Sequence, residues 1–347
     1  MHDTADFRSD KCALPTHDMI AAMSRSQWGD GQDDLGETTR ELERRAAELT
    51  GKEAALFCVT GTMANQLAIM THTRPGDTIL LDEISHTFWV EGGGPAALAG
   101  AQTHALRSTD GMMALDAMAL ACDRVHAGAR VTLLCTENTH NFAGGRVVPV
   151  DYLESVRDLA HSHGAKVHLD GARITNASVA SGVPVARYAE TADSLMFCLS
   201  KGLCAPVGSV LCGDEETIAR ARHLMHRFGG QPKQPGPLAA CGVIALATMV
   251  DRLAEDHDNA ARLAEGLGKL PGIDAKLVVE APETNMVFMT LIDGDADVFI
   301  ETLAARGVHG YHIECGRMRF VTHRDVDAED VDRAVEVFRD VLLGKGA

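Results

Sequence analysis

Two ionisable residues each follow an apolar run that is typical of a buried strand. Lys201 follows the run SLMFCLS, and Asp170 ends the run VHLD thirty-one positions earlier. Lysine is rarely buried unless it is paired or reactive, because desolvation favours the neutral amine, which attacks aldehydes. A carboxylate on a neighbouring strand can accept a hydrogen bond from a protonated heterocycle and keep that ring cationic. Together they supply what pyridoxal phosphate needs: a Schiff-base amine and a partner for the pyridine nitrogen.

Two further segments could complete such a site. VTGTMANQ follows an apolar run and opens a helical pattern, so the N–H groups of Gly61, Thr62 and Met63, with the Thr62 hydroxyl, could hold a phosphate. In DEISHTFWVEGGG, His86 follows another predicted strand. A flat imidazole there could stack on a cofactor ring or take a proton, and a solvated loop histidine is the alternative interpretation.

Short apolar runs alternate with amphipathic segments from about residue 38 to 215, which predicts βαβ units and an α/β fold with a mostly parallel sheet. The predicted strands are residues 54–59, 78–82, 131–136, 167–170, 195–199 and 209–212. Helices are predicted between them, for instance over 151–163 and 215–227. Sheets of this kind place ligand crevices at the carboxyl ends of their strands, where Asp170 and Lys201 are expected.

The pattern changes after the loop GGQPKQPG, and a long helical region is predicted through about residue 270. A strand over 286–291, a helix over 298–306, a strand over 318–322 and a closing amphipathic helix follow. We therefore predict a large cofactor-binding domain over 1–250, including an N-terminal segment that contacts substrate, and a small α/β domain over 251–347. Because no flexible linker separates them, we expect a long helix to join the two.

The composition excludes several classes of protein. Lys and Arg total 32 against 49 Asp and Glu, so the formal charge of −17 repels nucleic acid and anionic lipid. Without a signal segment or a run of membrane-spanning length, we expect a cytoplasmic protein with no membrane partner. The nine cysteines form no CxxC pair, so we expect reduced thiols and no metal site.

Motifs over nearly the whole length carry a family resemblance. They are FRSD, GKEAALF, TGTMAN, the SH of His86 with EGGG, ENTHN, HLDGARITNA, CLSKGLCAPVGSVLCG, EDHDNAARLAE and RFVTH. With them the chain resembles the low-specificity L-threonine aldolases, pyridoxal phosphate enzymes of fold type I. The resemblance implies a seven-stranded, mostly parallel sheet between helices, a small C-terminal domain, and self-association as a homodimer or homotetramer.

The resemblance also implies roles for individual residues. Lys201 would form the Schiff base, Asp170 would pair with the pyridine nitrogen, and His86 would stack on the ring. The substrate carboxylate would be held by Ser9, Arg173 and Arg319, with Arg173 also near the cofactor, and His140 would lie near the β-hydroxyl. From the residues alone, alternation places Arg317 and Arg319 on the same face of RMRFV, so either could be the carboxylate-binding arginine.

The chain departs from the family pattern at three places. Lys11 follows the N-terminal Ser-Asp where a threonine is usual, and the stretch 29–37 around Asp33 lacks the usual tyrosine. Lys233 replaces an arginine that the resemblance places near the cofactor phosphate, either in the same subunit or in a neighbouring one. Lysine supplies the charge but not the bidentate fork.

The site residues and the family resemblance together predict retro-aldol cleavage of a β-hydroxy-α-amino acid to glycine and an aldehyde. The substrate would be threonine, allo-threonine or a phenylserine-like amino acid. His86 or His140 would take the β-hydroxyl proton, directly or through water. β-Elimination, transamination or racemisation of an amino acid would use the same Lys201 and Asp170, so those residues do not discriminate among them. A relative that binds a ligand without catalysis is the remaining alternative.

Overall fold

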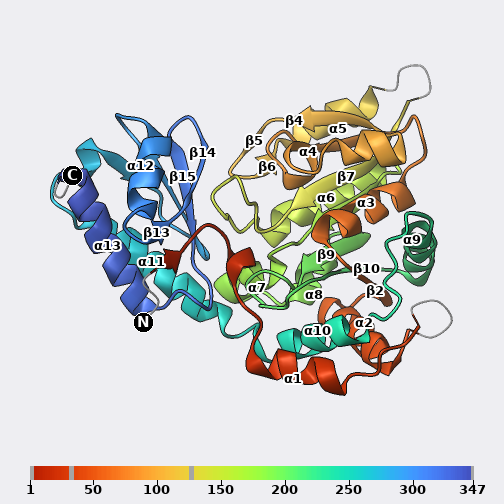
Figure 1. Ribbon diagram of the computed structural model, residues 1–347. Helices are drawn as coiled ribbons and strands as arrows, with labels where there is room; N and C mark the ends of the chain where they lie inside the picture. Colours follow the sequence, from red (N-terminus) through yellow and green to blue (C-terminus); the bar gives the residue numbers. More distant parts are fainter. Residues whose placement is uncertain (1–3, 31–34, 125–128, 345–347) are drawn as a thin grey trace. The chain divides into compact units, whose positions relative to one another are not determined.

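The computed structural model describes residues 4–30, 35–124 and 129–344, and the chain divides into two compact units (Figure 1). Unit 1 comprises Met1–Leu14 and Asp251–Ala347, and unit 2 comprises Pro15–Val250. The first fourteen residues, which we assigned to the large domain, thus group with the C-terminal part. The reason is that strand β1 (Ala5–Asp6) pairs with β13 (Val308–His309), and Phe7 is fully buried in the same core. Our assignment of domains stays a prediction.

A seven-stranded sheet forms the centre of unit 2 and confirms the predicted fold class. In spatial order its strands are β2 (Ala54–Cys58), β10 (Ser209–Gly213), β9 (Ser194–Cys198), β8 (Lys166–Asp170), β7 (Val131–Glu137), β3 (Thr78–Asp82) and β4 (Gln102–Leu106). Strand β10 is antiparallel to both of its neighbours, and the remaining pairs are parallel. Edge strand β4 was not predicted, because its residues are exposed or half-buried and form no apolar run.

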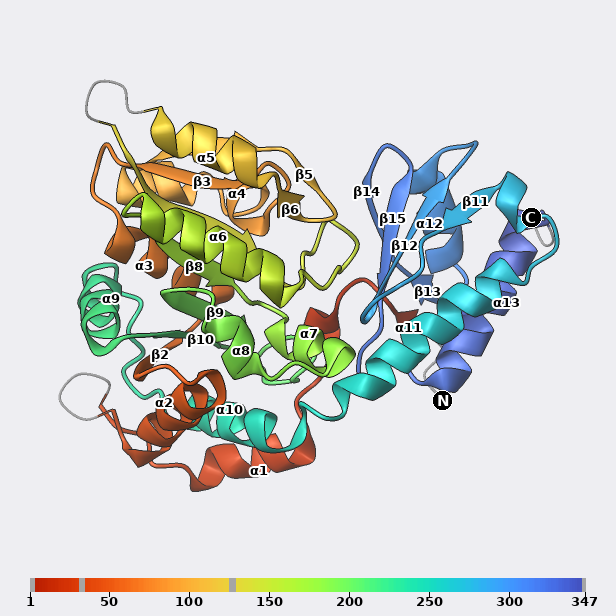
Figure 2. The same cartoon turned by 180° about the vertical axis from the view of Figure 1, so that it is seen from behind.

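Helices cover both faces of this sheet (Figures 1 and 2). One layer contains α3 (Gly61–His72) and α9 (Glu215–Arg227), and the other contains α2 (Glu37–Thr50), α5 (Leu115–Asp123), α6 (Val150–Ser162) and α8 (Val185–Ala189). Helix α10 (Gly236–Thr248) packs beside α2, and α1 (His17–Arg25) packs on α10. Parallel strands buried on both faces read as continuous apolar runs, and all five residues of β9 are buried. This burial is why the sequence located these strands to within one or two residues.

Short elements connect the strands of unit 2. They are α4 (His86–Trp89), the π-helical turn Pro95–Ala99, the hairpin of β5 (Ser108–Thr109) and β6 (Met112–Met113), and α7 (Ile174–Ser181). Helix α4 follows β3, and α7 follows β8, so both begin at the carboxyl edge of the sheet.

Unit 1 contains a four-stranded antiparallel sheet. Its spatial order is β11 (Leu277–Val279), β12 (Met286–Leu291), β15 (Arg317–Val321) and β14 (Tyr311–Glu314). The other elements of the unit are the 3₁₀ turns Asp10–Cys12 and Ile273–Ala275 and helices α11 (Leu253–Gly268), α12 (Ala296–Ala304) and α13 (Ala328–Leu342). Phe320 of β15 and Phe338 of α13 meet edge to face, with ring centroids 5.2 Å apart, in the centre of the core.

The prediction that one long helix joins the domains is wrong. Helix α10 ends at Thr248, and α11 begins separately at Leu253. Glu255 and Asp256 lie in the first turn of α11, where carboxylates favour a helix start. Within the described residues no single helix is long and apolar enough to cross a bilayer, and only α10 and α11 taken together meet the length and composition.

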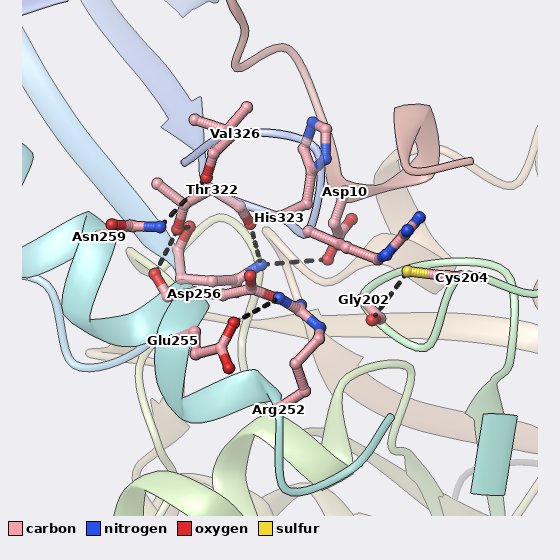
Figure 3. Close-up of polar contacts among 12 residues, drawn as sticks. Asp10, Gly202, Cys204, Arg252, Glu255, Asp256, Asn259, Thr322, His323 and Val326 are labelled. Atoms are coloured by element: carbon pink, nitrogen blue, oxygen red, sulfur yellow. Dashed lines mark hydrogen bonds and ion pairs between the residues drawn. The ribbon is translucent and has the colours of Figure 1, made fainter. Parts of the chain in front are cut away.

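Buried polar side chains tie the N-terminal segment of unit 1 to its sheet (Figure 3). Asn285 Nδ2 donates to Asp10 Oδ2 at 3.3 Å and to the Thr322 carbonyl at 3.0 Å. Thr322 Oγ1 donates to the carbonyl of Asp256 at 2.5 Å, and the Arg252 guanidinium is paired with the Asp256 carboxylate. Apart from Arg252, these side chains are fully buried, so the segment that carries Asp10 is held by hydrogen bonds shielded from water.

The ionisation of Asp256 gives a test of this core. Burial raises the pKa of Asp256 to about 6. The positive charges of Arg252 and His323 lower this pKa, and the negative charge of Asp10 raises it, but burial has the largest effect. Because the unfolded value is about 4, the stabilisation from the protonated carboxyl is complete below about pH 4 and is lost as the pH rises through about 6. We expect Asp256→Asn to gain about 1–3 kcal/mol in unfolding free energy, relative to the parent, between about pH 4 and pH 7.

Urea unfolding of the two proteins at stepped pH measures this difference. The exposed Asp258→Asn serves as the control, since it removes a carboxylate from the same helix without changing a buried group. Parallel pH profiles for Asp256→Asn and the parent would contradict the assignment.

Candidate active site

Three acidic residues end adjacent parallel strands of unit 2: Asp82 on β3, Glu137 on β7 and Asp170 on β8. Asp170 is in register with Glu137 on one side and with Met196 of β9 on the other. Lys201 lies in the turn that follows β9. Because parallel strands end at the same edge of a sheet, these side chains gather at the carboxyl edge that the sequence predicted for the site.

Asp170 is a buried carboxylate with two donors. Its Oδ1 accepts the Ala172 N–H at 3.0 Å, and its Oδ2 accepts a hydrogen of Asn65 Nδ2 at 2.7 Å. The side chain belongs to a residue that is only 4% exposed. Burial of a carboxylate is costly unless it is hydrogen bonded, and these two donors supply one hydrogen bond to each of its oxygens.

The turn that carries Lys201 is held by backbone hydrogen bonds. The Cys204 N–H donates to the Lys201 carbonyl at 2.8 Å, and the Leu199 N–H donates to the Gly208 carbonyl at 2.9 Å. Gly208 has φ +117°, and a Cβ there would lie 2.5 Å from the Phe57 ring, so only glycine fits. Lys201 is partly buried in this turn. The lysine therefore sits on a fixed loop beside the strand that ends in Asp170.

His86 is oriented by two carboxylates. Its backbone N–H donates to Glu137 Oε2 at 2.7 Å, and its Nδ1 lies 2.8 Å from Glu91 Oε1, which can only accept. Burial alone lowers the pKa of His86, but the hydrogen bond to Glu91 and the charge of Asp170 outweigh it and raise the pKa. The ring is one-third exposed, and its Nδ1 bond leaves Nε2 as the atom that can exchange a proton.

His140 is more enclosed than His86. Its Nδ1 accepts the Ala143 N–H at 3.3 Å, and its Nε2 lies 2.9 Å from Asp82 Oδ2, an ion-pair distance without the alignment of a hydrogen bond. Burial lowers the pKa of His140, but the negative charges of Glu137 and Asp82 outweigh it and raise the pKa. Both ring nitrogens thus face protein groups.

Arg173 lies at the start of α7, at the same edge. It is 5% exposed, and its Nη1 donates to Asn141 Oδ1 at 3.5 Å. The Asn141 N–H in turn donates to Glu137 Oε1 at 2.9 Å. The segment that follows β7 is therefore fixed by the strand-end carboxylate, and it brings Asn141 to the predicted arginine.

The N-terminus of α3 is capped by a side chain. Thr60 Oγ1 accepts the Met63 N–H at 3.1 Å, so that donor is already used, while the N–H groups of Gly61 and Thr62 belong to the unpaired first turn of a helix. A Cβ on Gly61 would lie 3.0 Å from Cys198 Sγ at the end of β9. The close packing of α3 against β9 places these amides beside the loop of Lys201.

The structure describes two of the three positions at which the chain departs from the family pattern, and both side chains are exposed. Lys233 is exposed in the loop between α9 and α10, and Lys11 is exposed in the turn Asp10–Cys12. Asp33, near the missing tyrosine, lies outside the described residues. A phosphate role for Lys233 stays a prediction.

Two of the predicted substrate residues lie together in unit 1. Ser9 is 2% exposed and caps the turn Asp10–Cys12, where its Oγ accepts the Lys11 N–H at 3.3 Å. Arg319 is 8% exposed, and its Nη2 donates to the carbonyl of Arg8 at 3.3 Å. The arginine and the serine are therefore neighbours across the N-terminal segment and β15.

Arg317 has a different environment. Its Nε and Nη2 donate to the two oxygens of Glu280 at 3.0 and 3.1 Å, and its guanidinium lies 4.2 Å from the centroid of the Phe288 ring. A bidentate ion pair stacked on an aromatic ring uses the fork that a substrate carboxylate would need. This favours Arg319 over Arg317 for the carboxylate.

Sequence reasoning missed four polar residues of the site: Asn65, Asp82, Glu91 and Glu137. Glu137 and Asp82 carry a usable signal, since each ends an apolar run as Asp170 does. Glu91 precedes three glycines, and Asn65 stands among apolar residues of α3. A polar residue inside an apolar helix is a signal of a buried hydrogen bond, but it does not name the partner.

His86, Glu91 and Asp170 lie close enough together to be considered as ligands of a metal ion. The nearest ligand atoms of His86, Glu91 and Asp170 are within 4.8 Å of one another. Asn65 Nδ2 already donates to both carboxylates, at 2.8 Å to Glu91 and 2.7 Å to Asp170. A metal ion at this point would have to displace that amide, so the hydrogen-bond donors fit the cluster without one.

Solved structures with the same fold support the architecture. A threonine aldolase of Leishmania major superposes with a TM-score of 0.83 at 21% identity, covering 97% of this chain and 99% of that one. Serine palmitoyltransferase of Sphingomonas wittichii superposes with a TM-score of 0.76 at 19% identity, covering 98% and 88%. At these identities the likeness establishes the fold.

Sequence comparisons reach further. Residues 6–293 match the family model described as beta-eliminating lyase. The chain is 38% identical to low-specificity L-threonine aldolase 1 of Arabidopsis thaliana, over 98% of this chain and 97% of that one. It is 39% identical to the low specificity L-threonine aldolase of Escherichia coli K12, over 97% and 99%. Such identity over full length establishes kinship, and the chain therefore belongs to the beta-eliminating lyase family, alongside the low-specificity L-threonine aldolases.

Proposed function

We propose that this protein is a pyridoxal phosphate-dependent aldolase that cleaves β-hydroxy-α-amino acids, such as threonine and allo-threonine, to glycine and an aldehyde. The observation that carries the proposal is the placement of Lys201 and Asp170 at the carboxyl ends of neighbouring strands β9 and β8. The kinship with low-specificity L-threonine aldolases supports the substrate class. Phenylserine-like substrates would require a pocket larger than threonine needs.

The residues at the sheet edge fit pyridoxal phosphate by their chemistry. Lys201 offers an amine for the cofactor aldehyde, Asp170 offers a carboxyl acceptor for its ring nitrogen, and the α3 N-terminus offers amides for its phosphate. When bound, pyridoxal phosphate supplies an electron sink for the pair released as the Cα–Cβ bond breaks. The buried Asn65 and Ala172 donors hold the Asp170 side chain in place for this role.

His86 is the better candidate for the base that removes the β-hydroxyl proton. Its Nδ1 is committed to Glu91, which fixes the tautomer and leaves Nε2 to accept a proton. His140 has a backbone N–H on Nδ1 and Asp82 beside Nε2, so it is better suited to orienting a substrate hydroxyl or a water. Stacking of His86 on the cofactor ring is compatible with proton transfer at Nε2.

The substrate carboxylate needs a cationic fork. We keep Arg319, Ser9 and Arg173 for this role, because Arg319 and Arg173 are nearly buried and the guanidinium fork of Arg317 is already used by Glu280. Discrimination between stereoisomers would depend on how this clamp and His86 are placed around the substrate.

Self-association as a homodimer or homotetramer and a cytoplasmic location complete the proposal. Phe88, Trp89 and Val90 follow His86 and are 42%, 43% and 53% exposed, an apolar surface beside the site that a second copy would cover. The formal charge of −17 supports small-molecule rather than nucleic acid partners. Light scattering of the purified protein measures the assembly.

β-Elimination is the second candidate reaction, because the matching family model carries that name. We expect the protein, incubated with threonine and pyridoxal phosphate, to release acetaldehyde and glycine in equal amounts. Elimination from threonine would instead release 2-oxobutyrate and ammonia, while transamination and racemisation would release no aldehyde. Chromatography of the products distinguishes these outcomes, and a protein that binds the cofactor but forms no product would be a non-catalytic relative.

Lys201→Ala is expected to abolish turnover and the visible absorption that borohydride removes, since both require a Schiff base on the amine. Lys269→Ala is the matched control, because Lys269 is an exposed lysine at the C-cap of α11 that pairs with Glu265 one turn earlier. Absorption spectra before and after borohydride, with an aldehyde assay, provide the measurement. Full activity in Lys201→Ala would overturn the proposed function.

Glu91→Gln tests the role of His86 as base. Because Glu91 raises the pKa of His86, and a base must be neutral, the rate should rise with pH through that pKa. Removing the negative charge should lower the pKa of His86 and move the acidic limb of kcat/KM to lower pH. Glu83→Gln, which changes a half-exposed acid near the end of β3, is the control. An acidic limb that does not move would assign the base elsewhere.

A further inference from the structure

Asn65 joins the two acids that flank the site. It lies in α3, is 1% exposed, and its Nδ2 donates to Glu91 Oε1 at 2.8 Å and to Asp170 Oδ2 at 2.7 Å. An amide nitrogen has two hydrogens, so both are used by these two carboxylates. The reverse orientation would turn the amide oxygen toward two carboxylates, which repel it, so the arrangement of the amide is fixed.

The amide oxygen of Asn65 determines which atoms donate in a buried chain of hydrogen bonds. Because Asn65 Oδ1 can only accept, His168 Nε2, at 3.0 Å, must carry a hydrogen. His168 Nδ1 is then an acceptor, and the hydroxyl of Ser194 donates to it at 2.8 Å. The Ser194 oxygen is left to accept from His72 Nε2 at 2.9 Å.

The two histidines of this hydrogen-bonded chain, His168 and His72, remain neutral. Burial lowers the pKa of both His168 and His72 to about 4, so neither carries charge near pH 7. A neutral histidine donates from one ring nitrogen and accepts at the other. Every hydrogen bond therefore points the same way, from His72 through Ser194 and His168 to Asn65, and from Asn65 to the acids.

We propose that Asn65 is a positioning residue that holds Asp170 and Glu91 side by side by donating one amide hydrogen to each, and so couples His86 to the cofactor carboxylate. The inference rests on the proposed function, since Asp170 matters here as the partner of the pyridine nitrogen. Asp170 Oδ2 and Glu91 Oε1 would each lose the amide hydrogen that joins them if Asn65 were replaced by an apolar residue. The orientation of Asp170 toward the ring nitrogen and that of Glu91 toward His86 would then no longer be fixed by one side chain.

The hydrogen-bond direction can be measured without cofactor. We expect the ¹⁵N shifts of the histidine rings in the cofactor-free protein to show His168 as the Nε2–H tautomer, with the signal assigned through His168→Gln. Observation of the Nδ1–H tautomer at His168 would reverse the direction of the chain and overturn the inference, while the proposed function would stand.

The coupling is measured with two variants. Asn65→Leu removes the donor to both acids, whereas Gln66→Leu removes a buried amide that donates to Glu91 Oε2 at 2.7 Å and leaves Asn65 in place. We expect Asn65→Leu to bind pyridoxal phosphate about 10-fold more weakly or worse than the parent, with a changed absorption spectrum of the bound cofactor. We expect Gln66→Leu to stay within about 3-fold of the parent, because its donor does not reach Asp170.

The outcomes separate the two proposals. A parent protein that fails to bind pyridoxal phosphate overturns the proposed function, and this inference with it. A parent that binds, together with equal affinity and spectra for Asn65→Leu, overturns the inference alone. Circular dichroism and thermal unfolding show whether both variants fold. If Asn65→Leu does not fold, the tautomer of His168 in the parent still tests the inference.

Discussion

The site depends on supplying hydrogen-bond donors to several carboxyl side chains that are buried at one edge of a sheet. Asp82, Glu137 and Asp170 end three adjacent strands, where water is largely excluded. Such burial is unfavourable unless each acid finds hydrogen-bond donors. Each acid accepts a backbone N–H of the segment that follows its own strand, from Ile84, Asn141 and Ala172 respectively, so these segments fold back over the strand ends that precede them. The loops of the site take their shape from this requirement.

The same acids determine where positive charge is stable. His86 and His140 both have raised pKa values because negative charge nearby outweighs the cost of burial. The amine of Lys201 follows the next strand of the same edge. A cofactor with a cationic ring and an anionic phosphate would meet carboxylates at one end and helix amides at the other. Electrostatic preorganisation of this kind costs no rearrangement when the ligand binds.

Much of this could be predicted from local sequence. Strands buried on both faces are continuous apolar runs, and a charged residue at the end of such a run has few structural uses, which is why Lys201 and Asp170 were identified. Edge strand β4 has no such run, and the pair of residues in β1 is too short to leave a pattern. Phe7 shows the limit, because one apolar residue in a polar segment does not reveal the core it enters.

The rest could not be predicted because it depends on partners far apart in the chain. Alternation along the strand places Arg317 and Arg319 on the same face and does not distinguish them. The structure distinguishes them because Arg317 pairs with Glu280, which is 37 positions away in the sequence. Asn65 is a similar case, since its two acids are 26 and 105 positions away. A buried amide is unfavourable unless all of its hydrogens and lone pairs are used, so its tolerance for substitution is set by those distant groups. For such residues the chemistry is a property of the fold, and the local sequence records only that a polar side chain stands among apolar ones.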